Sequence, residues 1–163
     1  LDLTDEQIEA GIENVQIAKK RMEIVNLKNN VTLVNDTYNA SLESVKEALK
    51  YISNISSGRK IAVLGDILEL GEFSSQIHEK IGKEVARQKI DVLICSGTHS
   101  EIICDIAAEN GIKDENIYYE QNTKSVIKRI KENMKKGDVI LLKASNGMKF
   151  SEIATELIEK FGI

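Results

Sequence analysis

The chain has 163 residues, which is long enough for one domain with a sizeable core. Its formal net charge is −4 and its pI is about 5.4. This acidic balance argues against a nucleic-acid partner, because binding backbone phosphates needs clustered cations. No apolar run approaches the ~20 residues of a membrane helix, and the acidic N-terminus is unlike a secretory signal, so we expect a cytoplasmic protein without membrane insertion.

The first 30 residues differ from the rest of the chain. Residues 4–7 (Thr-Asp-Glu-Gln) are typical of a capping box, which predicts a helix. Because the chain begins with Leu1 rather than Met, we expect it to be a piece of a longer protein. The different pattern leads us to interpret residues 1–24 as the end of a preceding domain with its linker, and residues 25–163 as the main domain. Arg21 closes a short basic run that could bind a phosphate, although such runs are more often a solvated surface.

From residue 31 onward, short apolar runs alternate with amphipathic segments. We predict strands over residues 31–35, 60–65, 91–96, 116–119 and 138–143, and a further strand over residues 22–25 that pairs with the first of these. Apolar residues three or four apart in the intervening segments predict helices. Strands that alternate with helices indicate an α/β fold, a Rossmann-like three-layer α/β/α domain with a mostly parallel sheet.

Two further patterns concern the helix starts and the cysteines. Cys95 in a predicted strand and Cys104 in a predicted helix match neither a zinc spacing nor a disulfide framework, so we expect two buried, inert thiols. Hydroxyl residues stand where helix N-caps are expected. These are Ser41, Ser74, Ser100, Thr123 and Ser151.

Polar loops follow three of the predicted strands. They read Asn35-Asp-Thr-Tyr-Asn-Ala-Ser41, Gly65-Asp-Ile-Leu-Glu-Leu-Gly71 and Lys143-Ala-Ser-Asn-Gly-Met-Lys149. Because the carboxyl ends of parallel strands meet at one edge of a sheet, we expect these loops to form one binding face.

The side chains in these loops allow more than one interpretation. Asp36 and Asn39 could bind a hydroxylated ligand such as a ribose, or they could shape a turn and cap a helix. Asp66 and Glu69 could bind an ammonium group, a neighbouring domain or magnesium, or their loop could simply pack. Lys143 could bind a carboxylate.

The remaining polar residues carry weaker signals. Ser145 and Asn146 could assist Lys143 in binding an anion, or they could belong to a capped turn. His78 could pair with Glu69, and no nucleophile accompanies it in a recognisable spacing. The sequence holds neither a Gly-x-x-x-x-Gly-Lys-Ser/Thr phosphate loop nor a Gly-x-Gly-x-x-Gly motif, which argues against a dinucleotide oxidoreductase.

The three loops, together with His78 and the segment Arg21-Met-Glu23, resemble the C-terminal domain of the Mur ligase family. The Gly-Asp-x-x-Glu-Leu-Gly loop is similar to that of the members that add D-alanyl-D-alanine to UDP-N-acetylmuramoyl-tripeptide. The sequence departs from the family pattern at Leu42, where proline is common, and at Ala144 and Asn146, where glycine and arginine are common.

The resemblance implies an ATP-dependent amide ligase of peptidoglycan precursor synthesis. In that family ATP phosphorylates the tripeptide carboxylate, the incoming amine attacks the acyl phosphate, and Mg²⁺ neutralises the phosphates. The resemblance assigns ATP binding to Arg21, Asp36, Tyr38 and Asn39. It assigns substrate binding to Asp66, Glu69, Lys143, Ser145 and Asn146.

The resemblance also implies that this chain is inactive alone, because the N-terminal and central domains, including the P-loop, are absent from it. We therefore expect no catalytic residue and no metal ligand here. The alternatives are a domain of another ligase of this superfamily, such as a folylpolyglutamate synthetase, or a non-catalytic nucleotide-binding or partner-binding module.

Overall fold

The computed structural model of the chain describes residue 4 and residues 20–55 and 58–163. The helix predicted from residues 4–7 therefore lies outside the described residues, apart from Thr4. The elements in chain order are β1 (Glu23–Leu27), β2 (Val31–Asp36), α2 (Leu42–Ile55), β3 (Lys60–Gly65), α3 (Ser74–Arg87), β4 (Val92–Ser96), α4 (Ser100–Glu109), β5 (Ile117–Tyr119), α5 (Thr123–Asn133), β6 (Val139–Lys143) and α6 (Phe150–Phe161).

These strands form one mixed sheet in the order β1-β2-β6-β3-β4-β5. Strand β1 is antiparallel to β2, and every other pairing is parallel, which confirms the predicted sheet. The hairpin predicted at the N-terminal edge is also present, with Asn29 at φ 61° in the turn between β1 and β2. Because β1 begins at Glu23, it crosses the domain boundary predicted between residues 24 and 25.

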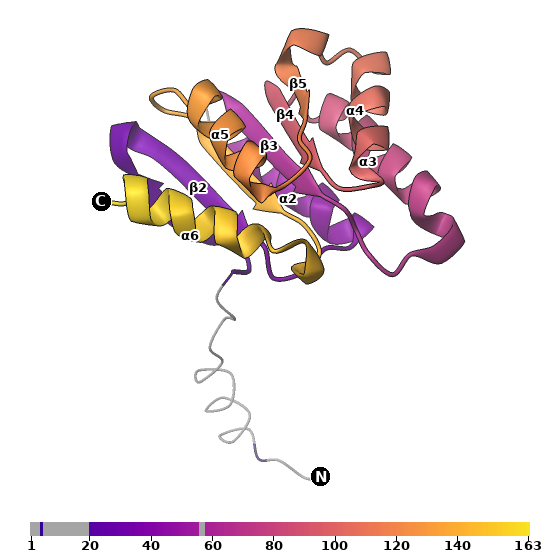
Figure 1. Ribbon diagram of the computed structural model, residues 1–163, viewed down its shortest axis with the longest axis horizontal. Helices are drawn as coiled ribbons and strands as arrows, with labels where there is room; N and C mark the ends of the chain where they lie inside the picture. Colours follow the sequence, from indigo (N-terminus) through magenta and orange to yellow (C-terminus); the bar gives the residue numbers. More distant parts are fainter. Residues whose placement is uncertain (1–3, 5–19, 56–57) are drawn as a thin grey trace.

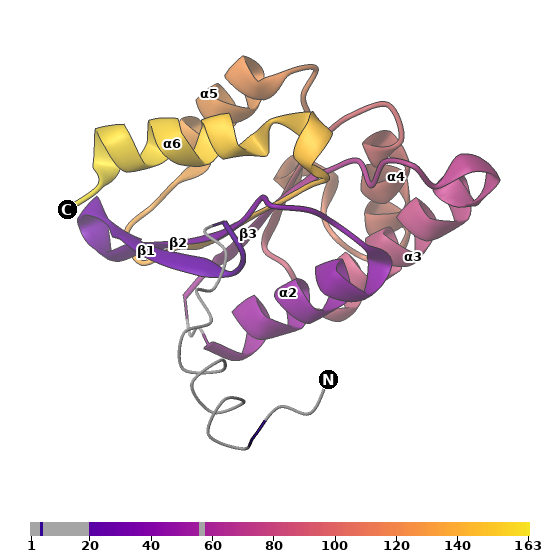
Figure 2. The same ribbon diagram turned by 90° about the horizontal axis from the view of Figure 1, so that it is seen from below.

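Helices cover both faces of the sheet, so the fold is the predicted three-layer α/β/α arrangement (Figure 1). In Figure 2, α5 and α6 lie above the strands, α2 lies below them, and α3 and α4 lie to the right; residues of α2, α3 and α4 share one core cluster. Alternate strand residues point to opposite layers: Leu64 packs with the α2–α4 layer, whereas Val63 packs with α5 and α6. Burial on both faces explains why these strands are continuously apolar.

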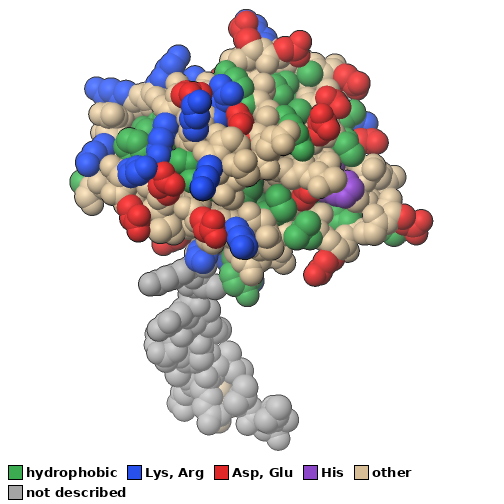
Figure 3. Space-filling model, viewed as in Figure 1, with side chains coloured by type: hydrophobic (Ala, Val, Ile, Leu, Met, Phe, Trp, Pro, Cys, Tyr) green, Lys and Arg blue, Asp and Glu red, His purple; other side chains and the backbone are tan. Residues whose placement is uncertain are grey.

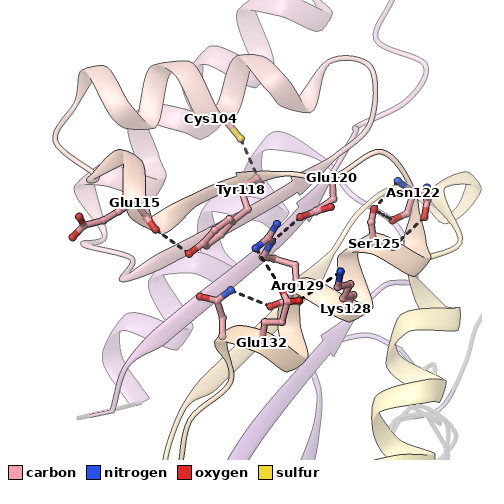
Figure 4. Close-up of polar contacts among 10 residues, drawn as sticks. Cys104, Glu115, Tyr118, Glu120, Asn122, Ser125, Lys128, Arg129 and Glu132 are labelled. Atoms are coloured by element: carbon pink, nitrogen blue, oxygen red, sulfur yellow. Dashed lines mark hydrogen bonds and ion pairs between the residues drawn. The ribbon is translucent and has the colours of Figure 1, made fainter.

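The N-caps were predicted less well than the strands. Ser41 caps α2 as predicted, since its Oγ accepts a hydrogen bond from the Ser44 N–H at 3.2 Å. Asn122, rather than Thr123, caps α5 in a capping box with Ser125 (Figure 4). The prediction was wrong at Ser74, Ser100 and Ser151, which lie inside α3, α4 and α6.

Charged side chains on α5 fix that helix against the edge strand β5. Arg129 stacks on the ring of Tyr118, with 4.5 Å between the guanidinium carbon and the ring centroid, and also pairs with Glu120 at 2.7 Å (Figure 4). Lys and Arg gather over α5 and α6 with Asp and Glu among them (Figure 3). Glu156, for example, accepts hydrogen bonds from Lys131 and Lys160, which lower its pKa to about 2. This surface is therefore an ion-pair network rather than a bare cationic face.

Both cysteines lie in the core, as predicted, and both are free thiols. Burial raises the pKa of the Cys95 thiol, so this residue stays protonated and unreactive. Among the described residues, no helix combines the length and the apolar character needed to cross a bilayer.

Candidate functional site

The three predicted polar loops lie at the same edge of the sheet. Strands β2, β6 and β3 are neighbours and parallel, and they end at Asp36, Lys143 and Gly65. The register places Lys143 between Asp36 on one side and Leu64 on the other. The expectation of one polar edge is therefore confirmed.

A buried ion pair joins the ends of β2 and β6. Lys143 Nζ donates a hydrogen bond to Asp36 Oδ2 at 2.5 Å and a second to the Asn39 carbonyl at 3.1 Å. The Met22 N–H donates to the other oxygen of Asp36 at 3.2 Å. The Lys143 side chain is only 1% exposed, so its charge depends on these partners.

The first groove at this edge lies beside the ion pair. It has a volume of about 550 Å³ and is lined by Arg21, Asp36, Tyr38, Asn39 and Lys143 together with residues of α2; we call it the Arg21–Tyr38 groove. The Arg21 guanidinium stacks on the exposed Tyr38 ring, 4.1 Å from its centroid. A cation and an aromatic face at one groove suit a ligand with a phosphate and a planar ring.

The second groove adjoins the first, because Tyr38 and Asn39 line both. It has a volume of about 790 Å³, and we call it the Leu68–Phe73 groove after two exposed apolar side chains in its wall. Its other side chains include predicted site residues and one lysine from α3. These are Glu69, Ser145, Asn146 and Lys80.

Two predicted substrate residues lie elsewhere than the sequence suggested. Lys143 lies with the predicted ATP-binding residues, because it is the last residue of β6 and neighbours the end of β2. Asp66 is 3% exposed and turns inward, where it accepts hydrogen bonds from the His99 N–H at 3.1 Å and the Ser100 hydroxyl at 2.5 Å. Its carboxylate thus stabilises the loop from inside the protein and does not line either groove.

The predicted pairing of His78 with Glu69 is wrong. His78 is fully buried on α3, where Nδ1 lies 2.8 Å from the Ser74 carbonyl and Nε2 lies 3.2 Å from the Ile67 N–H. Glu69 is exposed and has a left-handed backbone at φ 63°. A side chain other than glycine costs about 1–2 kcal/mol in that conformation. Glu69 therefore occupies a strained position that faces the second groove.

Sequence reasoning missed several residues that line the grooves. Tyr51 and Glu47 enter the first groove from α2, and Lys80 and Phe73 enter the second from α3 and the turn before it. Tyr51 is half-buried and the other three are exposed, and no local sequence signal distinguishes them from ordinary surface residues.

The described residues do not fit a resident metal ion. Across residue 4 and residues 20–55 and 58–163, no three His, Cys, Asp or Glu side chains gather as a metal site would require. In the first groove, the carboxylate of Asp36 is already engaged by Lys143 and Met22. Magnesium requires several unengaged oxygen ligands, and the other carboxylate that lines this groove, that of Glu47, is not enough by itself.

Comparison with known proteins adds three findings. Residues 20–146 match the family model described as Mur ligase, glutamate ligase domain. The chain is 34% identical over 158 residues to the UDP-N-acetylmuramoyl-tripeptide--D-alanyl-D-alanine ligase of Bacillus subtilis, covering 96% of this chain and 34% of the relative. The chain thus spans about a third of the length of the curated relatives it matches.

Solved structures show the same similarity. A MurF ligase from Thermotoga maritima in complex with ADP superposes with a TM-score of 0.72 at 29% identity, covering 90% of this chain and 32% of that one. A MurF structure from Acinetobacter baumannii gives a TM-score of 0.78 at 25% identity, covering 96% and 34% of the two chains.

Proposed function

The chain belongs to the Mur ligase family by the match over residues 20–146, and we propose that it is the C-terminal domain of an ATP-dependent ligase that adds D-alanyl-D-alanine to UDP-N-acetylmuramoyl-tripeptide. The reaction passes through an acyl phosphate and belongs to peptidoglycan precursor synthesis in the cytoplasm. The N-terminal and central domains of the same protein carry the other substrate and the P-loop, so this domain does not catalyse the reaction by itself. Because Glu23 and Ile24 already belong to β1, the connection to the central domain lies before residue 23.

The observation that carries the proposal is the pair of adjoining grooves at one sheet edge. The Arg21–Tyr38 groove takes ATP, with Arg21 near the phosphates and Asp36, Tyr38 and Asn39 near the ribose and base. The ADP in the Thermotoga maritima relative supports a nucleotide in this family. Magnesium accompanies the ATP phosphates and is held by residues outside this chain.

The Leu68–Phe73 groove takes D-alanyl-D-alanine, which carries an ammonium group, a carboxylate and two methyl groups. The groove offers Glu69 for the ammonium, Lys80 and Asn146 for the carboxylate, and Leu68 and Phe73 for the methyl groups. Because Tyr38 and Asn39 border both grooves, the incoming amine lies next to the nucleotide. This proximity is what attack on an acyl phosphate requires.

The direct test is an assay of the full-length protein with ATP, UDP-N-acetylmuramoyl-tripeptide and D-alanyl-D-alanine, which should release phosphate and form the pentapeptide. Substitution of D-alanyl-D-alanine by glutamate, with a folate acceptor, tests the alternative of a folylpolyglutamate synthetase. Phosphate release only in the assay with glutamate and a folate acceptor would contradict the proposal.

In that protein, Arg21→Met should raise the KM for ATP roughly tenfold or more, because a hydrogen bond to a charged group contributes about 1.5–3 kcal/mol. Arg21 is exposed, so its removal leaves the buried Asp36–Lys143 pair in place. Lys20→Met is the matched control, since Lys20 is also exposed but does not line the groove. An equal effect of both substitutions on the KM for ATP would contradict the role of Arg21.

Calorimetry on this chain alone separates a ligase domain from a stand-alone nucleotide-binding module. We expect ATP to bind weakly or not at all, because the groove has a single exposed cation, Arg21, among the described residues that line it. Micromolar or tighter binding of ATP by the isolated chain would favour the module.

A further inference from the structure

A buried histidine holds the loop that forms one wall of the Leu68–Phe73 groove. His78 lies on α3, has no exposed surface, and accepts a hydrogen bond at Nε2 from the Ile67 N–H at 3.2 Å. Ile67 directly precedes Leu68 and Glu69, which line the groove. The imidazole therefore holds the backbone at the point where the loop turns from the core toward the groove.

The contacts of His78 define its protonation state. Nδ1 lies 2.8 Å from the Ser74 carbonyl, which can only accept, so Nδ1 carries the proton. Nε2 then keeps its lone pair for the Ile67 N–H. The ring is neutral in this arrangement, and the 4.0 Å separation between Nε2 and Asp66 Oδ1 is not an ion pair. A second ring, that of His99, lies 5.6 Å away between centroids.

The next residue of the loop is anchored by the loop after β6. The Leu68 N–H donates to Ser145 Oγ at 3.0 Å, and the Ser145 N–H donates to the Asp66 carbonyl at 3.1 Å. Two consecutive amides, those of Ile67 and Leu68, are thus held by side chains from α3 and from the loop after β6. With both amides fixed, the left-handed Glu69 that follows is held facing the groove.

We propose that His78 is a positioning residue for the incoming dipeptide: its unprotonated Nε2 holds the Ile67 amide so that Leu68 and Glu69 keep the shape that binds D-alanyl-D-alanine. This inference rests on the proposed function. His78 does not contact the substrate, because it has no exposed surface. Its effect should therefore fall on the dipeptide and not on ATP, whose groove it does not line.

Two variants that differ by one methylene test the proposal in the full-length protein. His78→Asn keeps an amide that can donate to the Ser74 carbonyl but is too short to accept from Ile67, whereas the longer His78→Gln can supply that acceptor. We expect His78→Asn to raise the KM for D-alanyl-D-alanine roughly tenfold while the KM for ATP stays within about twofold. His78→Gln should recover most of the loss.

The possible outcomes separate the two proposals. Normal ligation by the wild-type protein with an unchanged dipeptide KM in His78→Asn would overturn the role of His78 alone. An equal rise in the KM values for dipeptide and ATP, or no recovery in His78→Gln, would also overturn it. Failure of the wild-type protein to use D-alanyl-D-alanine would contradict the proposed function and the dipeptide role together.

A spectroscopic measurement tests the hydrogen bond without any substrate. In this chain at pH 7.5, a long-range proton–nitrogen spectrum of the histidine rings should show His78 protonated at Nδ1 and unprotonated at Nε2. The Ile67 amide should exchange with solvent more slowly in the wild type than in His78→Asn. A ring protonated at Nε2, or an Ile67 exchange rate equal in both proteins, would overturn the proposal.

Discussion

Replacing Lys143 by methionine should lower the free energy of unfolding of this chain by about 3–5 kcal/mol, because it leaves the Asp36 carboxylate without its buried partner. The Asp36 side chain is 9% exposed and the Lys143 side chain 1%, so the carboxylate left without its cation stays largely desolvated. Methionine fills much of the same volume and limits the loss to charge and hydrogen bonding. Urea unfolding followed by circular dichroism measures the change.

Two further variants separate the ion pair from a general effect of removing lysine. Lys50→Met on α2 is the matched control, since Lys50 is exposed and its loss should change stability by no more than about 0.5 kcal/mol. The double variant Asp36→Asn with Lys143→Met removes both charges and should be more stable than Lys143→Met alone. A Lys143→Met protein as stable as the Lys50→Met protein would show that the pair contributes little.

This pair also illustrates how far the sequence alone could predict the site. The apolar runs of β2 and β6 predicted two parallel strands, and parallel strands bring their carboxyl ends to one edge. The sheet order was not predictable from these runs. Only that order makes β6 the neighbour of β2 and places Lys143 opposite Asp36, so the two residues were assigned to different ligands.

The loop after β3 shows a second limit of sequence reasoning. Its glycines and carboxylates predicted a polar loop, but not that Asp66 turns inward while Glu69 stays exposed. That direction depends on partners distant in sequence, namely the His99 N–H and the Ser100 hydroxyl at the start of α4. For the same reason Ser100 was mistaken for an N-cap, although its hydroxyl serves the Asp66 carboxylate. The direction of such side chains is determined by tertiary contacts, which leave no periodic pattern in the sequence.

The inward turn of Asp66 depends on the absence of a side chain at residue 97. Gly97 follows β4 with φ +136°, and a Cβ placed there would lie 2.3 Å from Asp66 Oδ1, inside any acceptable contact. The carboxylate cannot move aside without losing its hydrogen bonds to His99 and Ser100. A buried carboxylate with lost hydrogen bonds is costly, so this glycine is required by both the backbone and the neighbouring acid.

Gly97→Ala should therefore lower the free energy of unfolding by roughly 3–5 kcal/mol, the sum of backbone strain and displacement of Asp66. Gly111→Ala provides the matched control, because Gly111 also has a positive φ, +103°, but a Cβ there would meet nothing within 4 Å. Its cost should be the backbone strain alone, about 1–2 kcal/mol. The melting temperatures of the two variants should thus differ by several degrees, at about 2–4 °C per kcal/mol for a chain of this size. Equal melting temperatures would mean that Asp66 can leave its buried position freely, and that the support of the groove wall lies elsewhere.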